Sequence, residues 1–257
     1  MTLPKNSNRD RELAINSLRV RAMTRNLLAE AEQLVKQAMA EYDSSHDWYH
    51  VDRVRNQGLG SAISIDCLAL RLAELHLDTS FNDCSIDMLV VELSALFHDL
   101  FDRKYKAIDG GRVTEDDLQS WLIERNVSQV QSNLILRIIS NVSYSKEMEL
   151  KKSGGWTEWH ARCVELHCVM DADKLDALGA FGIFRCAAFS GNRNIPLYVS
   201  EDDELYRNSA VGHFDGKLFK LENMMVTNAG QRVAAARTAV MRSFIEQLHV
   251  EAQRLDL

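Results

Sequence analysis

Apolar residues recur at three- and four-residue steps over most of the chain, which is the spacing of one face of an α-helix. The clearest runs cover residues 27–39 and 89–97. Similar spacing predicts further helices over residues 60–76, 113–125, 128–141, 159–171, 174–189, 214–226 and 230–254. No proline lies between Pro4 and Pro196, which is typical of helix-rich proteins and uncommon in sheet proteins with many turns. The pattern therefore predicts an all-α fold.

The same pattern gives no sign of a division into several domains. Residues 192–212 contain a proline and an acidic cluster, and we expect them to form a long surface loop. Neither an internal repeat nor a low-complexity linker occurs in the sequence. We therefore predict one domain over residues 1–257, in which residues 42–257 form the core. We expect residues 1–41 to form an N-terminal helical extension, which is either an addition to this core or a contact in a homodimer.

Composition and charge narrow the classes of function. The chain is 46% hydrophobic and 26% charged, which is ordinary for a globular protein, and its formal net charge is −7. A surface for duplex nucleic acid normally shows as a basic patch, and the sequence contains none. No apolar stretch reaches the length of about 18 residues that a membrane span needs, and no secretory core is present at the N-terminus. Five cysteines without CxxC spacing predict reduced, buried thiols, so we expect a cytoplasmic protein.

Three short segments place histidine or aspartate beside bulky apolar residues on predicted helices: residues 44–54, 95–102 and 169–185. A charged group alone in such surroundings would be costly to bury. A shared divalent cation would offset that cost for several of these groups at once. Two neutral imidazoles and two carboxylates suit a borderline-to-hard divalent metal, and four protein ligands leave room for water and a substrate oxygen.

These segments resemble the HD-domain superfamily of metal-dependent phosphohydrolases in the order of their motifs and in the flanking residues. The resemblance extends from about residue 42 to the end of the chain through SHDWYHVDRV, HDLFD, DADKLDALGAFGIFR and HFDGKLFKLENMMVTNAGQRVAAAR. These motifs look most like one subfamily of bacterial and plant HD nucleotide pyrophosphohydrolases. The resemblance implies an all-α helical bundle of the HD type with about ten helices and a site in a cleft between central helices.

The resemblance also implies roles for individual residues. The metal ligands that it implies are His50, His98, Asp99 and Asp173. Asp102 matches a position that often holds a catalytic acid, one helical turn beyond Asp99. Only His160 and His167 lie between the HD doublet and the last aspartate, in a context unlike two-metal motifs, which favours a site for one ion. We expect manganese first, with magnesium, cobalt, nickel, iron or zinc as alternatives.

Members of this subfamily hydrolyse nucleoside triphosphates, including deoxy forms, to the monophosphate and pyrophosphate. The resemblance therefore implies a small-molecule nucleotide as the substrate here, with attack of metal-activated water at the α-phosphorus. Cationic side chains should neutralise the remaining phosphates. The candidates are Lys104, Lys174, His46 and Arg53, followed by Arg185 and Lys217.

Other functions stay open from the sequence. The enzyme could instead be a phosphomonoesterase or phosphodiesterase acting on nucleoside monophosphates or cyclic nucleotides, or the chain could be a non-catalytic nucleotide sensor. His46 and His50 share a helical face as in HExxH zinc proteases, with Asp47 as the base, but this explanation leaves the other motifs unused.

Single residues also have plainer interpretations. Asp102 could be a helix-terminal charge or a group that orients a ligand histidine, and Lys174 could be an ordinary solvated lysine. Asp171 lies two residues before Asp173 and points elsewhere on a helix, so we expect it at the surface or in hydrogen bonds rather than on the metal.

Overall fold

The computed structural model describes residues 7–40, 42–55, 69, 72, 73, 75, 86–101 and 113–253. Within these ranges all regular elements are helical and no strand occurs, which confirms the predicted all-α fold. No helix in these ranges is both long and apolar enough to cross a membrane.

The α-helices are, in chain order, α1 (Ser7–Ala38), α2 (Trp48–Arg55), α4 (Met88–Phe97), α5 (Glu115–Glu124), α6 (Gln129–Ile139), α7 (Tyr144–Ser153), α8 (Glu158–Arg162), α9 (Val164–Asp176), α10 (Gly179–Asn192), α11 (Ala210–His213), α12 (Phe219–Leu221) and α13 (Asn228–Gln253). Between α10 and α13 the chain also forms two short 3₁₀ helices, Tyr206–Asn208 and Glu222–Met224, and a π-helical segment, Phe214–Leu218.

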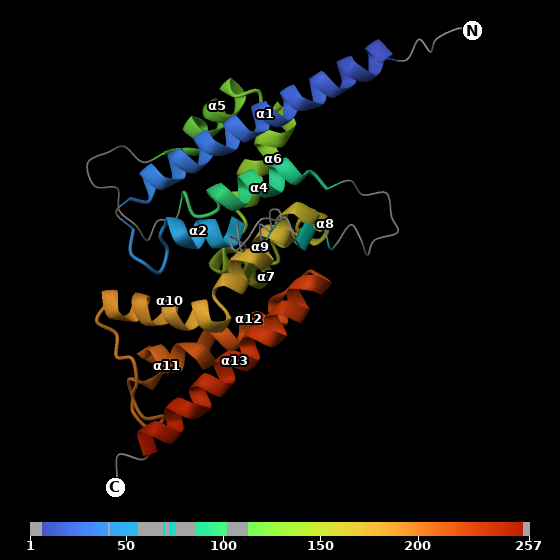
Figure 1. The fold of residues 1–257 in the computed structure, drawn as a ribbon. Coiled ribbons are helices and arrows are strands. Elements are labelled where there is room, and N and C mark those ends of the chain that lie inside the picture. The colour runs from blue at the N-terminus through green and yellow to red at the C-terminus, as the bar shows by residue number, and fades with distance from the viewer. Residues whose placement is uncertain are drawn as a thin grey trace.

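Helix α4 is the centre of the fold, because it packs against α1, α2, α6 and α9 (Figure 1). Its side chains are apolar nearly all round, and Val90, Leu93 and Leu96 have no exposed surface. A helix of this kind must be buried on every side, which explains why four helices surround it. The Asp87 side chain caps its first turn by accepting hydrogen bonds from the N–H groups of Leu89 and Val90.

Helix α9 connects this central part to the C-terminal helices. It packs against α2 and α4 on one side and against α10 and α13 on the other, and α10 and α13 pack on each other at the C-terminal end of the molecule (Figure 1). The turn from α9 to α10 requires glycine at two positions. Gly179 has a left-handed φ of 73°, and a Cβ atom at Gly182 would lie 2.2 Å from the Ala177 carbonyl oxygen. This tight turn places the end of α9 beside the first half of α10.

Several predicted boundaries differ from the structure. The predicted break between helices near residue 172 is wrong, because α9 continues to Asp176 and the chain turns only before Gly179. The predicted helix 214–226 is a series of short α, π and 3₁₀ pieces that ends at Met224. Helix α7 was not predicted, since its sequence YSKEMELKKS has almost no apolar face.

Other sequence predictions can be placed only in part. Residues 193–205 form the predicted loop, although short helical turns begin before its expected end at residue 212. Three cysteines, Cys163, Cys168 and Cys186, are buried free thiols as predicted. The other two cysteines and most of the predicted helix 60–76 lie outside the described residues.

Candidate metal centre

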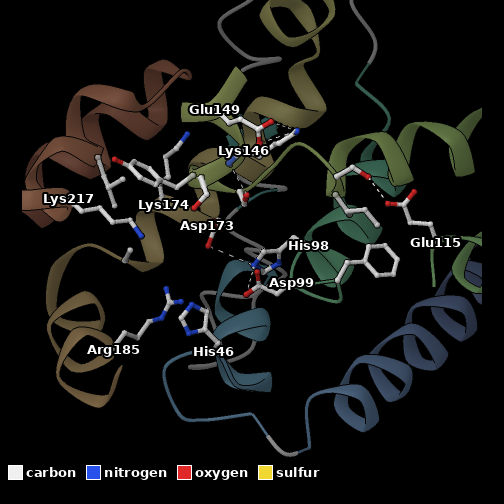
Figure 2. Close-up of a pocket in the computed structure, with 18 residues that line it drawn as sticks. His46, His98, Asp99, Glu115, Lys146, Glu149, Asp173, Lys174, Arg185 and Lys217 are labelled. Carbon is white, nitrogen blue, oxygen red and sulfur yellow. Dashed lines mark hydrogen bonds and ion pairs between the residues drawn. The ribbon is translucent and has the colours of Figure 1, made fainter. Parts of the chain in front are cut away.

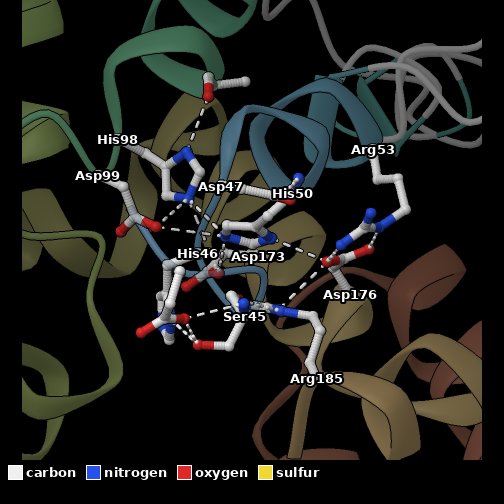
Figure 3. A network of polar contacts seen from close by, with 12 residues as sticks. Ser45, His46, Asp47, His50, Arg53, His98, Asp99, Asp173, Asp176 and Arg185 are labelled. Carbon is white, nitrogen blue, oxygen red and sulfur yellow. Dashed lines mark hydrogen bonds and ion pairs between the residues drawn. The ribbon is translucent and has the colours of Figure 1, made fainter. Parts of the chain in front are cut away.

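Three helices bring the predicted metal ligands to one point. His50 lies on the buried face of α2, His98 and Asp99 lie in the turn that follows α4, and Asp173 lies on α9 (Figure 3). The Nε2 atoms of His50 and His98 are 3.2 Å apart. Asp99 Oδ2 lies 3.3 Å from His50 Nε2 and 3.4 Å from His98 Nε2.

The last predicted ligand completes this cluster. Asp173 Oδ1 is 3.5 Å from His50 Nε2 and 3.8 Å from His98 Nε2. Donor atoms bound to one ion at about 2.0–2.2 Å lie roughly 3–3.6 Å from one another. The separations from the two imidazoles are close to this range. His50, His98 and Asp99 have the placement of ligands around a single cation, and Asp173 lies beside them as the expected fourth.

The hydrogen bonds of the two imidazoles orient their Nε2 atoms. His98 Nδ1 lies 2.8 Å from the Ala95 carbonyl oxygen, which can only accept, so Nδ1 carries the hydrogen. His50 Nδ1 lies 2.8 Å from the Asp176 carboxylate and donates to it in the same way. In the neutral rings both Nε2 atoms therefore present lone pairs to each other and to two carboxylates. Such an arrangement is stable only with a positive charge at its centre.

The pKa values of the cluster reflect the close approach of carboxylates and imidazoles. Burial alone would lower the pKa of His98, but the Asp99 carboxylate, together with Asp173 and the Ala95 carbonyl, raises it to about 9. Burial would raise the pKa of Asp99, yet His98 and His50 hold it well below its usual range. Asp99 Oδ2 is buried and has no hydrogen bond of ordinary geometry within the described part of the chain. A divalent metal fits these residues, since it would satisfy all four donor atoms together.

A second carboxylate on α9, Asp176, supports the cluster from outside, a role that was not predicted from the sequence motifs. It is fully buried and contacts His50, Arg53 and Arg185 (Figure 3). Burial would raise the pKa of Asp176, but the hydrogen bond from His50 and the charges of both arginines hold it well below the usual range. The sequence could have indicated this role, because Asp176 follows Asp173 by three residues and so lies on the same helical face.

The cluster opens into a cleft of about 700 Å³. His98, Asp99 and Asp173 line its floor, and Figure 2 shows basic side chains around them. Among the residues that the structure describes, the basic ones that line the cleft are His46, Lys146, Lys174, Arg185 and Lys217. They come from the segment before α2, from α7, α9 and α10, and from the π-helical segment. Glu115 and Glu149 line the cleft as well, and Glu149 pairs with Lys146. The cleft thus presents basic groups beside the candidate metal ligands, as an anion site requires.

Of the predicted substrate contacts that the structure describes, His46 and Lys174 line the cleft and Arg53 does not. His46 lines the cleft, and its Nδ1 atom lies 2.8 Å from Ser45 Oγ. Lys174 lines the cleft but is only 3% exposed and forms a 2.7 Å ion pair with the buried Glu147. The interpretation of Lys174 as a solvated lysine is therefore wrong. Arg53 donates to both oxygens of Asp176 and is not among the described residues that line the cleft.

Two further predictions, the catalytic residue Asp102 and the substrate contact Lys104, lie outside the described residues. Asp171 is buried and accepts hydrogen bonds from the N–H groups of Val226 and Thr227, which confirms a hydrogen-bonding role and contradicts a surface position.

The histidines considered as additional ligands are engaged in other contacts. The His167 Nε2 atom lies 2.7 Å from the His160 carbonyl oxygen, and the His160 Nε2 atom lies 3.1 Å from the Asn141 side-chain oxygen. Asp47, the base of the protease alternative, accepts a hydrogen bond from the His50 N–H at the start of α2.

Comparison with known proteins gives relatives of nearly full length. No known family profile matches the chain. The protein YpgQ of Bacillus subtilis is 30% identical over 232 residues, which cover 89% of this chain and 97% of YpgQ. The crystal structure of YpgQ in complex with ADP has a TM-score of 0.64 at 26% identity, covering 89% of this chain and 96% of that one. An HD-superfamily hydrolase from Bacillus thuringiensis has a TM-score of 0.64 at 28% identity, and the match covers 90% of this chain and 98% of that hydrolase. This likeness confirms the HD type of the all-α fold.

Binding of a divalent metal should stabilise the native protein through the cluster. At a metal concentration of 100 times Kd we expect about 2.7 kcal/mol of added stability, seen as a rise in Tm by differential scanning calorimetry. Asp99→Asn should remove most of this rise, because it takes away a charged donor that lies near both imidazoles. Glu158→Gln changes an exposed acid elsewhere and should keep the full rise. An equal rise in the parent and in Asp99→Asn would place the metal elsewhere.

Proposed function

The chain belongs to the HD superfamily of metal-dependent phosphohydrolases, in the family of YpgQ, and from this premise we propose that it hydrolyses nucleoside and deoxynucleoside triphosphates to the monophosphate and pyrophosphate. The observation that carries the proposal is the convergence of two imidazoles and two carboxylates at the floor of a cleft with basic walls. The acids and imidazoles suit a cation, and the basic residues suit the phosphates of a substrate.

His50, His98, Asp99 and Asp173 would hold the metal, with manganese as our first choice. A bound divalent metal supplies a Lewis acid and lowers the pKa of a bound water. The protein contributes the orientation of the ligands. The Ala95 carbonyl and the Asp176 carboxylate hold the two rings with Nε2 toward the cleft floor.

A nucleotide substrate is supported by the size and charge of the cleft. Its volume of about 700 Å³ lies within the range of roughly 300–1,000 Å³ that is common for small-molecule sites. Arg185 and Lys217 come from separate elements and line the cleft together with His46. Charge-assisted hydrogen bonds from such groups would neutralise the phosphates that leave as pyrophosphate. YpgQ has been crystallised with ADP, which supports the same class of ligand for this chain.

The placement of Lys217 depends on an unusual piece of backbone. The residue lies in the π-helical segment Phe214–Leu218, and its Nζ atom lies 4.8 Å from the centre of the Tyr144 ring on α7. π-Helical turns are rare and occur often at functional sites, because the extra residue changes the direction of a side chain. We propose that Lys217 contacts a phosphate of the bound substrate. Asp102 remains our proposal for the acid that assists proton transfer.

Product analysis tests the reaction directly. We expect purified protein, incubated with pooled nucleoside and deoxynucleoside triphosphates and Mn²⁺, to release monophosphates and pyrophosphate that anion-exchange chromatography separates. Asp99→Ala should release neither product, since it lacks a ligand. Diphosphate and orthophosphate as products would contradict attack at the α-phosphorus. Turnover of monophosphates or cyclic nucleotides alone would favour an esterase, and binding without turnover of any of these substrates would favour a sensor.

Lys217→Gln should lower kcat/KM for a triphosphate by roughly tenfold to hundredfold, since a hydrogen bond to a charged group contributes about 1.5–3 kcal/mol. Steady-state kinetics with one deoxynucleoside triphosphate would measure this effect. Lys220→Gln is the matched control, because Lys220 lies just beyond the π-helical segment, in α12, and donates to the Gly216 carbonyl without lining the cleft. Equal kinetics for the two variants would remove Lys217 from the substrate site.

A further inference from the structure

Asp176 has an unusual set of partners for a carboxylate without any exposed surface. Its Oδ2 atom accepts from His50 Nδ1 at 2.8 Å, and its Oδ1 atom accepts from Arg53 Nε at 2.9 Å. Arg53 Nη2 lies 3.2 Å and Arg185 Nη1 lies 3.1 Å from Oδ2. One buried acid thus joins three basic side chains from two other helices, α2 and α10.

The two arginines fix the position of this carboxylate. A guanidinium group is planar and presents its donors as a rigid fork, so two hydrogen bonds from Arg53 define the plane of the Asp176 carboxylate. Two positive charges also offset the cost of burying the negative one. The acceptor for the His50 ring therefore has a single position, and the ring has a single orientation.

The two candidate ligand histidines differ in the hydrogen-bond partner of their Nδ1 atoms. His98 Nδ1 donates to a neutral backbone carbonyl, that of Ala95, whereas His50 Nδ1 donates to a charged carboxylate. A carboxylate partner makes the opposite ring nitrogen a stronger electron donor and holds the tautomer with Nε2 unprotonated. Asp176 also lies on the same helix as Asp173, one turn further along. Its bond to His50 therefore fixes a ligand on α2 relative to a ligand on α9.

We propose that Asp176 is a positioning residue that sets the metal affinity of the site by fixing His50, and that Arg53 and Arg185 hold it in place. The proposal rests on the metal-dependent part of the proposed function. Arg185 also lines the cleft and donates from Nε to the Ser45 carbonyl at 2.8 Å, beside His46. The same network therefore joins the metal ligand His50 to the basic wall of the cleft.

A purely structural ion network would affect folding and leave metal binding unchanged, so both must be measured. Kd for Mn²⁺ can be obtained from the electron paramagnetic resonance signal of free Mn²⁺, and Tm of the metal-free protein from calorimetry. For Asp176→Asn we expect Kd to rise about tenfold to hundredfold, as is typical when the partner of a ligand histidine is removed.

Asp171→Asn is the matched control, since Asp171 is an equally buried aspartate on α9 whose carboxylate accepts hydrogen bonds from Val226 and Thr227. It should lower Tm and leave Kd within about twofold of the parent value. A folded Asp176→Asn variant with the Kd of the parent would overturn the proposal.

If Asp176→Asn does not fold, a second pair of variants tests whether Asp176 sets the metal affinity. Arg53→Gln removes a support of Asp176 that lies outside the cleft, and we expect Kd for Mn²⁺ to rise roughly three- to tenfold. Arg55→Gln on the same helix breaks ion pairs with Glu32 and Glu92 and should not change Kd. Equal Kd values for the two variants would overturn the proposal.

Measurements on the parent protein separate a failure of the positioning role from a failure of the proposed function. A parent that binds Mn²⁺ and turns over triphosphates, beside a folded Asp176→Asn variant with unchanged Kd, removes only the positioning role. A parent that binds no divalent metal overturns the proposed function, and the role of Asp176 with it.

Discussion

Two buried imidazole nitrogens face each other at 3.2 Å beside two carboxylates, and the polar contacts of the site hold this arrangement. Hydrogen bonds from the far side of each ring turn both lone pairs inward, so the cluster needs positive charge at its centre. The apolar helix α4 and its neighbours bring the three ligand-bearing segments together. The hydrophobic core therefore provides the convergence, and the polar contacts provide the orientation.

The charges around the cleft have two separate tasks. Asp99 and Asp173 lie at the candidate metal position, while basic residues line the cleft together with Glu115 and Glu149. Some basic residues form ion pairs within the protein. Lys174 pairs with the buried Glu147 and thereby joins α9 to α7. Arg185 has both roles, because it contacts Asp176 and also lines the cleft. In the proposed function, metal binding and anion binding would therefore depend on one connected network.

Apolar spacing predicted the helical fold, because it is a local property of the sequence, whereas the four candidate ligands came from the resemblance to the HD superfamily. Helix α7 was not predicted, because its residues are mostly polar. The ion pair between Glu147 on α7 and Lys174 on α9 depends on tertiary packing, so it could not be predicted from the sequence. The end of α9 was misplaced because the turn is set by the left-handed Gly179 and by the close approach at Gly182. Asp176 could have been found from its helical spacing, whereas its two arginine partners come from α2 and α10 and required the structure.

Anomalous X-ray scattering from crystals of the Mn²⁺-loaded protein, measured at the manganese absorption edge, would locate the bound ion. We expect one peak per chain, about 2.0–2.3 Å from the Nε2 atoms of both histidines and from carboxylate oxygens of both aspartates. The residues concerned are His50, His98, Asp99 and Asp173. A peak at other residues, two peaks in the cleft, or no peak at this cluster at saturating metal would contradict this prediction.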